Sequence, residues 1–455
     1  MKIELPKNSF IFLIWNLTIL AIISVIFENA GIFAVGLFGI LVVLLCSLGL
    51  DNYTWRIVII CSTIAILWMT FQYFGLVEIF GKPYYAHDDE TYERYGRIFY
   101  DAEAYLLYQA PKVDYTLEDV RGYFWIVSWI IRICSIFGSF HTIAPRIINI
   151  YLWISTAVLT YKIIKQEDDS FDYRISDLVL FGLAIFPNAL YISSFVYRDT
   201  LCIFLVITFV YCFGRLERQM QSNEGIRISN VILWVAICAI SIYLLFATRK
   251  KLIVLLGAIG AADILLKQNS KNLILRRAIL LAIFVIVGGT TVLDQVLKVS
   301  RDYGNYIMNT LGYSEGLSGK IFSVPILPFG IFLRAIWGLM CPFPGGIFQQ
   351  DFLHYPLYSI EQTIVYMGTV FQLLCVPYLV KGIKKFDANA LDFLLAYLMV
   401  VATTFTFRHF IIIYPFLAIE IYYGLKQVVP AQIKNYTIFL LFVIISGGLI
   451  YLTLK

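Results

Sequence analysis

The stretch MKIELPKNSFIFLIWNLTILAIISVIF, residues 1–27, decides the class of fold. From Ser9 to Phe27 it contains no charged side chain, and this is close to the length that an α-helix needs to cross the hydrocarbon core of a bilayer. It has no small-residue cleavage site of the kind that ends a secretory signal peptide. We therefore predict that this segment is a retained transmembrane helix.

Apolar segments of this length recur along the whole chain. Of its 455 residues, 60% are hydrophobic and 14% are charged, against about 25% charged in an ordinary soluble domain. The formal net charge of +5 does not indicate nucleic-acid binding. We predict an all-α polytopic membrane protein, a single integral membrane domain over 1–455 with about 11–14 transmembrane helices. The predicted spans are 9–28, 31–50, 57–79, 144–164, 175–193, 200–215, 229–248, 252–267, 276–295, 366–382, 391–407, 410–426 and 436–453.

Two long segments, 80–143 and 296–365, are more polar than the rest. Each contains a shorter apolar piece with an arginine in its middle, Arg132 in the first and Arg334 in the second. A central cation is costly in a full span. We therefore predict an interfacial or re-entrant helix in each segment, in preference to a span.

The distribution of Lys and Arg predicts the orientation. Most of the cations in short loops fall on the side of the N-terminus, and cytoplasmic loops are the ones enriched in positive charge. The N-terminus is therefore expected in the cytoplasm, and both long segments on the outer face. We expect a multi-pass protein of the bacterial inner (cytoplasmic) membrane with its functional site outside.

The eight cysteines are dispersed, mostly within apolar spans, and no CxxC pair occurs. Neither a disulfide framework nor a zinc site is predicted.

The acids gather in YYAHDDETYERYGR, residues 84–97. Here Asp88, Asp89 and Glu90 follow His87 and lie between tyrosines, directly after a predicted span. A solvated loop without a role would account for the acids alone. Tyrosines at a membrane surface suit an interface or the stacking of a sugar, so the first outer segment is a candidate site.

Cations also lie at the predicted outer ends of separate spans, where positive charge is normally scarce. Such cations need an anionic partner, and a lipid phosphate or diphosphate would supply one. A carboxylate could then take the proton of an acceptor hydroxyl while the cations stabilise the departing phosphate. From this chemistry alone, glycosyl transfer and transport remain equally open. The candidate phosphate-binding residues are Arg146, Arg198, Arg249, Lys250 and Arg408.

The order of four motifs favours glycosyl transfer. DDETYERYGRIFYDAEAY (88–105) resembles the first outer loop of membrane glycosyltransferases of the GT-C superfamily, which include lipid A aminoarabinose transferases and protein mannosyltransferases. In that loop, an acidic pair precedes a tyrosine. IFGSFHTIAPRIINIYLWISTAVLTYKIIKQ (136–166), IFPNALYISSFVYRDTLCIFLVITFVYCFGR (185–215) and FRHFIIIYPFLAIEIYYGL (407–425) resemble later segments of the same family, in the expected order.

The resemblance implies roles for the acids. Asp89 is the leading catalytic base, with Asp88 close behind and Glu90 beside them; adjacent acids can share protons. Asp199 corresponds to a second acidic position, although a local salt bridge with Arg198 is an equal alternative.

Other roles are left open. For each candidate phosphate ligand, snorkelling of the side chain to lipid headgroups is an equal alternative. His87 and His409 could assist. A divalent cation is compatible with so many acids, but no ligand spacing demands a metal.

The predicted function is that of an inverting glycosyltransferase in cell-envelope glycan assembly. The donor would be a polyprenyl-phosphate-linked sugar, and the acceptor a glycan, lipid or protein; nucleic acid is not an expected partner. RAIWGLMCPFPGG (334–346) also resembles O-antigen and capsular repeat-unit polymerases, which use undecaprenyl-diphosphate oligosaccharides, and this is the first alternative. A transporter of lipid-linked sugars is the third, but Glu420 is almost the only charge placed within a predicted span, and there is no clear internal repeat.

Overall fold

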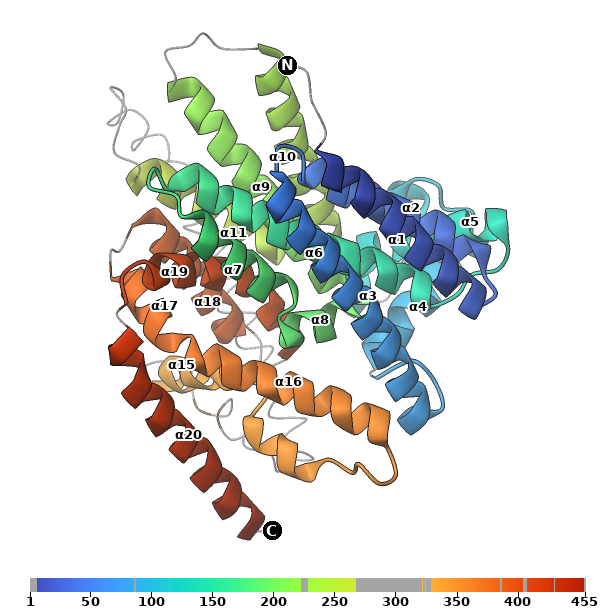
Figure 1. Cartoon of the computed structure of the whole chain (residues 1–455). Coiled ribbons are helices and arrows are strands. Elements are labelled where there is room, and N and C mark those ends of the chain that lie inside the picture. Colours follow the sequence, from blue (N-terminus) through green and yellow to red (C-terminus); the bar gives the residue numbers. More distant parts are fainter. Residues whose placement is uncertain are drawn as a thin grey trace.

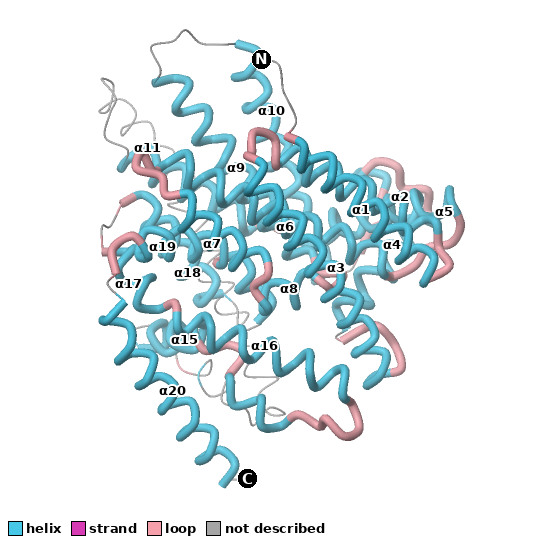
Figure 2. Tube along the Cα trace, in the orientation of Figure 1, coloured by secondary structure: helices cyan, strands magenta, loops and turns pink. Residues whose placement is uncertain are grey.

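The protein is described by a computed structural model over residues 6–85, 87–113, 115–221, 228–266, 329–384, 387–403, 407–428 and 430–453, with 321 and 324. Over these residues, all regular structure is helical and no strand occurs (Figures 1 and 2). The all-α prediction is therefore confirmed for this part of the chain. The predicted span 276–295 lies outside the described residues.

Consecutive helices among the first three run in opposite directions because the turns between them are only a few residues long, and the first of them packs against both of the others. Asp51 begins the third helix, where its carboxylate accepts hydrogen bonds from the amides of Tyr53 and Thr54, at 2.8 and 2.9 Å, which satisfies free donors of the first turn. Figure 1 shows the three side by side. They are α1 (Lys7–Ile26), α2 (Ala30–Cys46) and α3 (Asn52–Phe80).

A nearly fully buried helix, α6 (Ile143–Glu167), lies at the centre. It packs against α2, α3, α7, α9 and α19. The span predicted over 175–193 is bent by 46°, because Pro187 begins a new helix and cannot continue the hydrogen bonding of the preceding one. The helices that follow α6 are α7 (Tyr173–Ala184), α8 (Pro187–Ser193), α9 (Arg198–Gln221), α10 (Ile228–Thr248) and α11 (Lys251–Leu266).

The C-terminal part adds six further described helices. The predicted span 366–382 starts earlier than expected, since α16 begins at Pro356 and is followed by α17 across a bend of 42°. The last helix, α20, runs along the lower left of Figure 1. These helices are α15 (Ile331–Leu339), α16 (Pro356–Leu374), α17 (Val376–Ile383), α18 (Ala388–Thr403), α19 (Tyr414–Leu425) and α20 (Pro430–Thr453).

Six of the described helices are long and apolar enough to cross a membrane, or up to eight if each bent pair counts as one span. Four more apolar helices are shorter, at 10–17 residues. An integral multi-pass membrane protein is therefore supported.

The first long polar segment folds into α4 (His87–Asp101), two 3₁₀ turns and α5 (Arg121–Phe137). Near the start of α5, Gly122 packs against the carbonyl of Ala247 at the end of α10; near its end, Cys134 packs against Gly31 at the start of α2. Residues 117–137 are long and apolar enough for a span. Both ends of α5 contact the bundle near the end of α10 and the start of α2, and the interfacial placement of α5 stays a prediction.

The two arginines that suggested interfacial or re-entrant helices are accommodated by the protein. Arg132 lies over the rings of Tyr100 and Tyr105, at 5.2 and 4.3 Å. Arg334 is buried in α15 and donates to the carbonyl of Val324 at 3.2 Å. The nine residues of α15 reach only about 14 Å, too short for a span.

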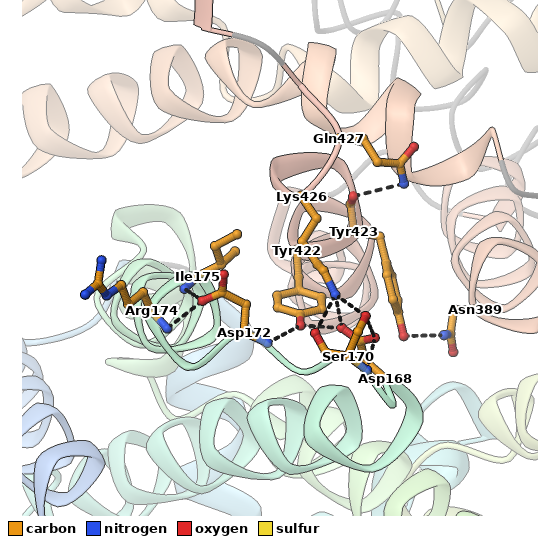
Figure 3. A network of polar contacts seen from close by, with 10 residues as sticks. All are labelled: Asp168, Ser170, Asp172, Arg174, Ile175, Asn389, Tyr422, Tyr423, Lys426 and Gln427. Atoms are coloured by element: carbon orange, nitrogen blue, oxygen red, sulfur yellow. Dashed lines mark hydrogen bonds and ion pairs between the residues drawn. The ribbon is translucent and has the colours of Figure 1, made fainter.

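A polar network ties the opposite end of the bundle together (Figure 3). After α6, Asp168 and Ser170 face the end of α19. Lys426 donates to the carbonyl of Ser170 at 2.8 Å and pairs with Asp168 at 2.5 Å, and Tyr422 also bonds Asp168 at 2.5 Å. These bonds fix the α6–α7 loop to α19. The loop follows the end of α6, whereas the acidic loop packs at the start of α6.

This arrangement gives a direct test of orientation. A cysteine in place of Lys112, beside α5, should react with a membrane-impermeant maleimide in intact cells. A cysteine in place of Asp169, in the opposite loop, should react only after permeabilisation. Both positions are exposed. The opposite labelling pattern would invert the orientation predicted from charge.

Candidate functional site

A buried ion pair between Asp89 and Arg146 holds the acidic loop on the bundle. Their side chains are both fully enclosed, with 2.8 Å between a carboxylate oxygen of Asp89 and a guanidinium nitrogen of Arg146. Arg146 also donates to the carbonyl of Ser194 at 3.0 Å and to that of Pro83. The start of α6 is thus bonded to the loops before α4 and after α8.

The same pair fixes the turn between α8 and α9. The second carboxylate oxygen of Asp89 accepts from the amide of Val196 at 2.6 Å. One turn along α6 from Arg146, Asn149 donates to the carbonyls of Phe195 and Tyr197, at 2.7 and 3.0 Å. These bonds satisfy buried backbone groups in the turn, and they set the position at which α9 begins.

This geometry does not favour Asp89 as the catalytic base predicted from the sequence. Its side chain has no exposed surface, and both of its oxygens are already bonded. Burial raises the pKa of Asp89 to about 6 although Arg146 opposes the rise. A general base must lie within hydrogen-bonding reach of the hydroxyl that it deprotonates, and a substrate cannot reach this carboxylate. Asp89 is better described as a positioning residue.

Asp199, at the start of α9, is the centre of a second group of charges. It is fully buried. Arg249 forms a close ion pair with it, Arg408 lies 3.8 Å away and the Nε2 atom of His409 lies 3.6 Å away. Three segments far apart in sequence meet here: the start of α9, the residues after α10 and the 3₁₀ turn Phe407–Ile412.

Asp88 joins this group from the acidic loop. One of its oxygens lies 2.5 Å from the guanidinium of Arg408, and its side chain is about half exposed, at 51%. Arg408 therefore bridges Asp88 and the buried Asp199. Asp89 is fully enclosed, so of these two aspartates Asp88 is the one that an arriving molecule can reach.

The guanidinium of Arg408 lies over an aromatic ring. It lies 5.1 Å from the ring centroid of Tyr197, and Tyr92 packs edge-on against that ring at 6.5 Å. Burial alone would lower the pKa of Arg408, but Tyr92, Asp199 and Asp88 together raise it. Arg408 is therefore a permanent cation with restricted solvation, which strengthens its attraction for an anion.

His409 has a different character from its neighbour. It is buried, and burial together with Arg249 and Arg408 holds its pKa well below the usual value. The imidazole is therefore neutral at physiological pH. It lies at the predicted site, but it adds no positive charge.

The other predicted residues are less central. Arg198 donates to the carbonyls of Asp119 and Thr248, at 2.8 and 2.7 Å, so it ties α9 to α10. Lys250 lies 4.0 Å from Asp119 at the rim, and Glu90 pairs with Lys82 at 2.8 Å in solvent. The backbone of His87 begins α4, and its side chain lies outside the described residues.

Sequence reasoning missed Glu361, a carboxyl of α16 that has no exposed surface. The predicted span began at position 366, which placed Glu361 in the polar segment before it. Its signal was a single acid in the apolar stretch YSIEQTIVYMG (358–368).

Among the described residues, no three His, Cys, Asp or Glu side chains are grouped in a way that could hold a metal ion. The site combines the half-exposed carboxylate of Asp88 with the largely buried guanidinium groups of Arg408 and Arg249. Together they can accept a proton and bind an anion.

Comparisons with protein-family models, with curated proteins and with solved structures gave no match to this chain. The geometry of the site and the sequence motifs therefore carry the functional argument.

The buried pair predicts a specific pattern of stability. Asp89→Asn or Arg146→Met alone should lower the free energy of unfolding by about 3–5 kcal/mol, because each leaves its charged or polar partner buried without compensation. The double variant should lose less than the sum of the two. Asp88→Asn, beside it and half exposed, is the matched control and should change little. Thermal unfolding of the purified proteins in detergent measures this, and strictly additive losses would contradict the pairing.

Proposed function

We propose that this protein is a membrane glycosyltransferase that moves a sugar from a polyprenyl-phosphate donor to a hydroxyl acceptor at the outer face of the membrane. The observation that carries the proposal is the contact between the accessible carboxylate of Asp88 and the enclosed guanidinium of Arg408. This contact supports the proposal because a carboxylate that can accept a proton lies next to a guanidinium that can bind an anion. The sequence motifs that resemble GT-C glycosyltransferases contain Asp88, Asp199 and Arg408 of this site, and Arg249 lies outside them.

Each residue has a definite part in the reaction. The acceptor oxygen attacks the anomeric carbon of the donor while its proton passes to Asp88. The bond between the anomeric carbon and the phosphate oxygen breaks, and its electron pair remains on the phosphate. Arg408 and Arg249 stabilise that growing charge. Attack from the face opposite the leaving phosphate inverts the anomeric centre.

The pairing of Asp88 with Arg408 suggests how the base becomes available. Both partners are satisfied when no substrate is bound. An incoming phosphate is a stronger bidentate partner for a guanidinium than a single carboxylate, so it would take over Arg408 and release Asp88. The base would then be freed only when the donor is in place.

An apolar cavity of about 640 Å³ supports a lipid-borne donor. It lies between α7, α16 and α19 and reaches Phe186, Pro187 and Tyr414. From Pro187, the seven residues of α8 lead over about 10 Å to the turn that Arg146 and Asn149 hold. A hydrocarbon chain in the cavity would place a phosphate headgroup near the polar site.

The base is tested by Asp88→Asn, which keeps the size of the side chain but removes the proton-accepting oxygen. Turnover should fall by about a hundredfold or more. Asp101→Asn, an exposed acid at the end of the same helix, is the matched control and should remain active. The assay follows transfer of labelled sugar from polyprenyl-phosphate donors in membranes that hold equal amounts of each variant. Near-normal turnover of Asp88→Asn would remove Asp88 from the mechanism.

Loss of a phosphate-binding cation should change the KM for the donor, in contrast to the loss of turnover expected for Asp88→Asn. Arg249→Ala should raise the KM for the lipid-linked donor by about tenfold, because a charge-assisted hydrogen bond to phosphate contributes roughly 1.5–3 kcal/mol. The KM for the acceptor should stay within about twofold, since Arg249 has no role in binding a neutral hydroxyl. Lys112→Ala is the control for loss of one exposed cation from the same face. An equal change in both KM values would indicate general disruption of the site.

A repeat-unit polymerase is the second candidate. Arg249 and Arg408 both face Asp199, so two guanidinium groups are close enough to serve the two phosphates of a diphosphate donor. Parallel assays with monophosphate sugars and diphosphate oligosaccharides separate the two reactions. A transporter would move the lipid-linked sugar without forming a new glycosidic bond in either assay.

A further inference from the structure

Glu361 is a buried carboxyl that has no hydrogen-bond partner among the residues that the structure describes. Its side chain has no exposed surface, and in the part of the chain that the structure describes neither of its oxygens has a hydrogen bond or an ion pair. It faces Gly75 of α3: a Cβ added at Gly75 would lie 3.0 Å from one carboxyl oxygen. The missing side chain at position 75 gives the carboxyl its space.

Such a group is costly unless something satisfies it. Nearly all buried polar atoms in proteins have hydrogen-bond partners, and an isolated buried carboxylate is destabilising by several kcal/mol. The two oxygens of Glu361 are therefore suited to accept hydrogen bonds from a bound ligand.

A row of aromatic rings connects Glu361 with the polar site. We call Phe80, Tyr85, Tyr191 and Tyr358 the aromatic shelf. Ring centroids are 6.0 Å apart for Phe80 and Tyr85, 6.0 Å for Phe80 and Tyr358, and 6.4 Å for Tyr85 and Tyr191. Tyr358 lies one turn before Glu361 on α16.

The other end of the shelf meets the charged site. Tyr191 lies 6.2 Å from the ring of Phe407, which directly precedes Arg408. Tyr85 lies three residues before Asp88, and nearly half of it is exposed, at 47%. The shelf therefore extends from the anion-binding group at one end to the carboxyl of Glu361 at the other, and Tyr85 gives it an exposed edge.

We propose that Glu361 and the aromatic shelf form the subsite for the sugar ring of the donor, with Glu361 accepting hydrogen bonds from its hydroxyl groups. This inference rests on the proposed function and extends it to the recognition of the glycosyl unit. The apolar C–H face of a pyranose or furanose ring stacks on aromatic side chains, while its hydroxyls need acceptors. Because Glu361 has no exposed surface, the side chains around it must move to admit a hydroxyl group.

The proposal predicts a residue that binds the sugar without taking part in bond breaking. Its test uses binding of two lipids to the purified full-length protein: a short-chain polyprenyl phosphate, and the same lipid carrying a hexosyl or pentosyl group. In the unaltered protein, the lipid that carries the preferred hexosyl or pentosyl group should bind more tightly than the polyprenyl phosphate without a sugar. Glu361→Gln should reduce that advantage by about tenfold and leave the dissociation constant of the bare lipid phosphate unchanged.

Two other variants act as controls. Glu420→Gln removes another buried carboxyl whose oxygens have no hydrogen bond among the described residues, but it lies in α19, near the opposite end of the bundle, and should leave both affinities unchanged. Arg408→Ala should weaken both lipids alike, since it acts on the phosphate that they share.

The outcomes separate this inference from the proposed function. If the unaltered protein binds both lipids equally, or if Glu361→Gln keeps the full advantage of the sugar, the sugar subsite is overturned while recognition of lipid phosphate stands. If the unaltered protein binds neither lipid, the proposed function fails and the subsite fails with it.

Discussion

The buried ion pair between Asp89 and Arg146 is the constraint on which the rest of the site depends. It is formed inside the protein, where the removal of two charges from water is expensive and only good geometry and further hydrogen bonds offset that cost. Here the bonds to Val196, Ser194 and Pro83 supply them. These groups lie in two segments, the α8–α9 turn and the loop before α4, so a single pair determines where α4 begins, how α8 turns into α9, and which way the neighbouring acid faces.

The direction that Asp88 faces gives the two adjacent carboxylates, Asp88 and Asp89, different environments. Successive residues of an α-helix point about 100° apart, so with Asp89 turned into the protein, Asp88 turns toward the rim, where it meets Arg408. One acid becomes structural and the other becomes accessible. The same packing leaves Arg408 in contact with both Asp88 and the buried Asp199, so the cation is held in place by one acid and can exchange the other for a ligand.

The sequence predicted the membrane class, several of the long apolar helices and the gathering of acids and cations, because hydrophobic length and charge position are local properties. It could not distinguish Asp88 from Asp89, since the rotation of α4 is fixed only when Arg146, 57 residues away, packs against it. The bend at Pro187 had a local signal, the proline itself, but the apolar residues on both sides of it predicted one unbroken span over 175–193. Glu361 was missed for a related reason: a lone acid near a predicted span end looks solvated until α3, with a glycine at position 75, is seen to cover it.

The central claim is that a lipid phosphate replaces Asp88 as the partner of Arg408, and a structure determined with a polyprenyl phosphate bound tests it most directly. The account predicts a phosphate oxygen within hydrogen-bonding distance of the Arg408 guanidinium, with the Asp88 carboxylate released toward the acceptor side and the pair of Asp89 and Arg146 unchanged. A phosphate bound elsewhere, with Arg408 still paired to Asp88, would contradict it.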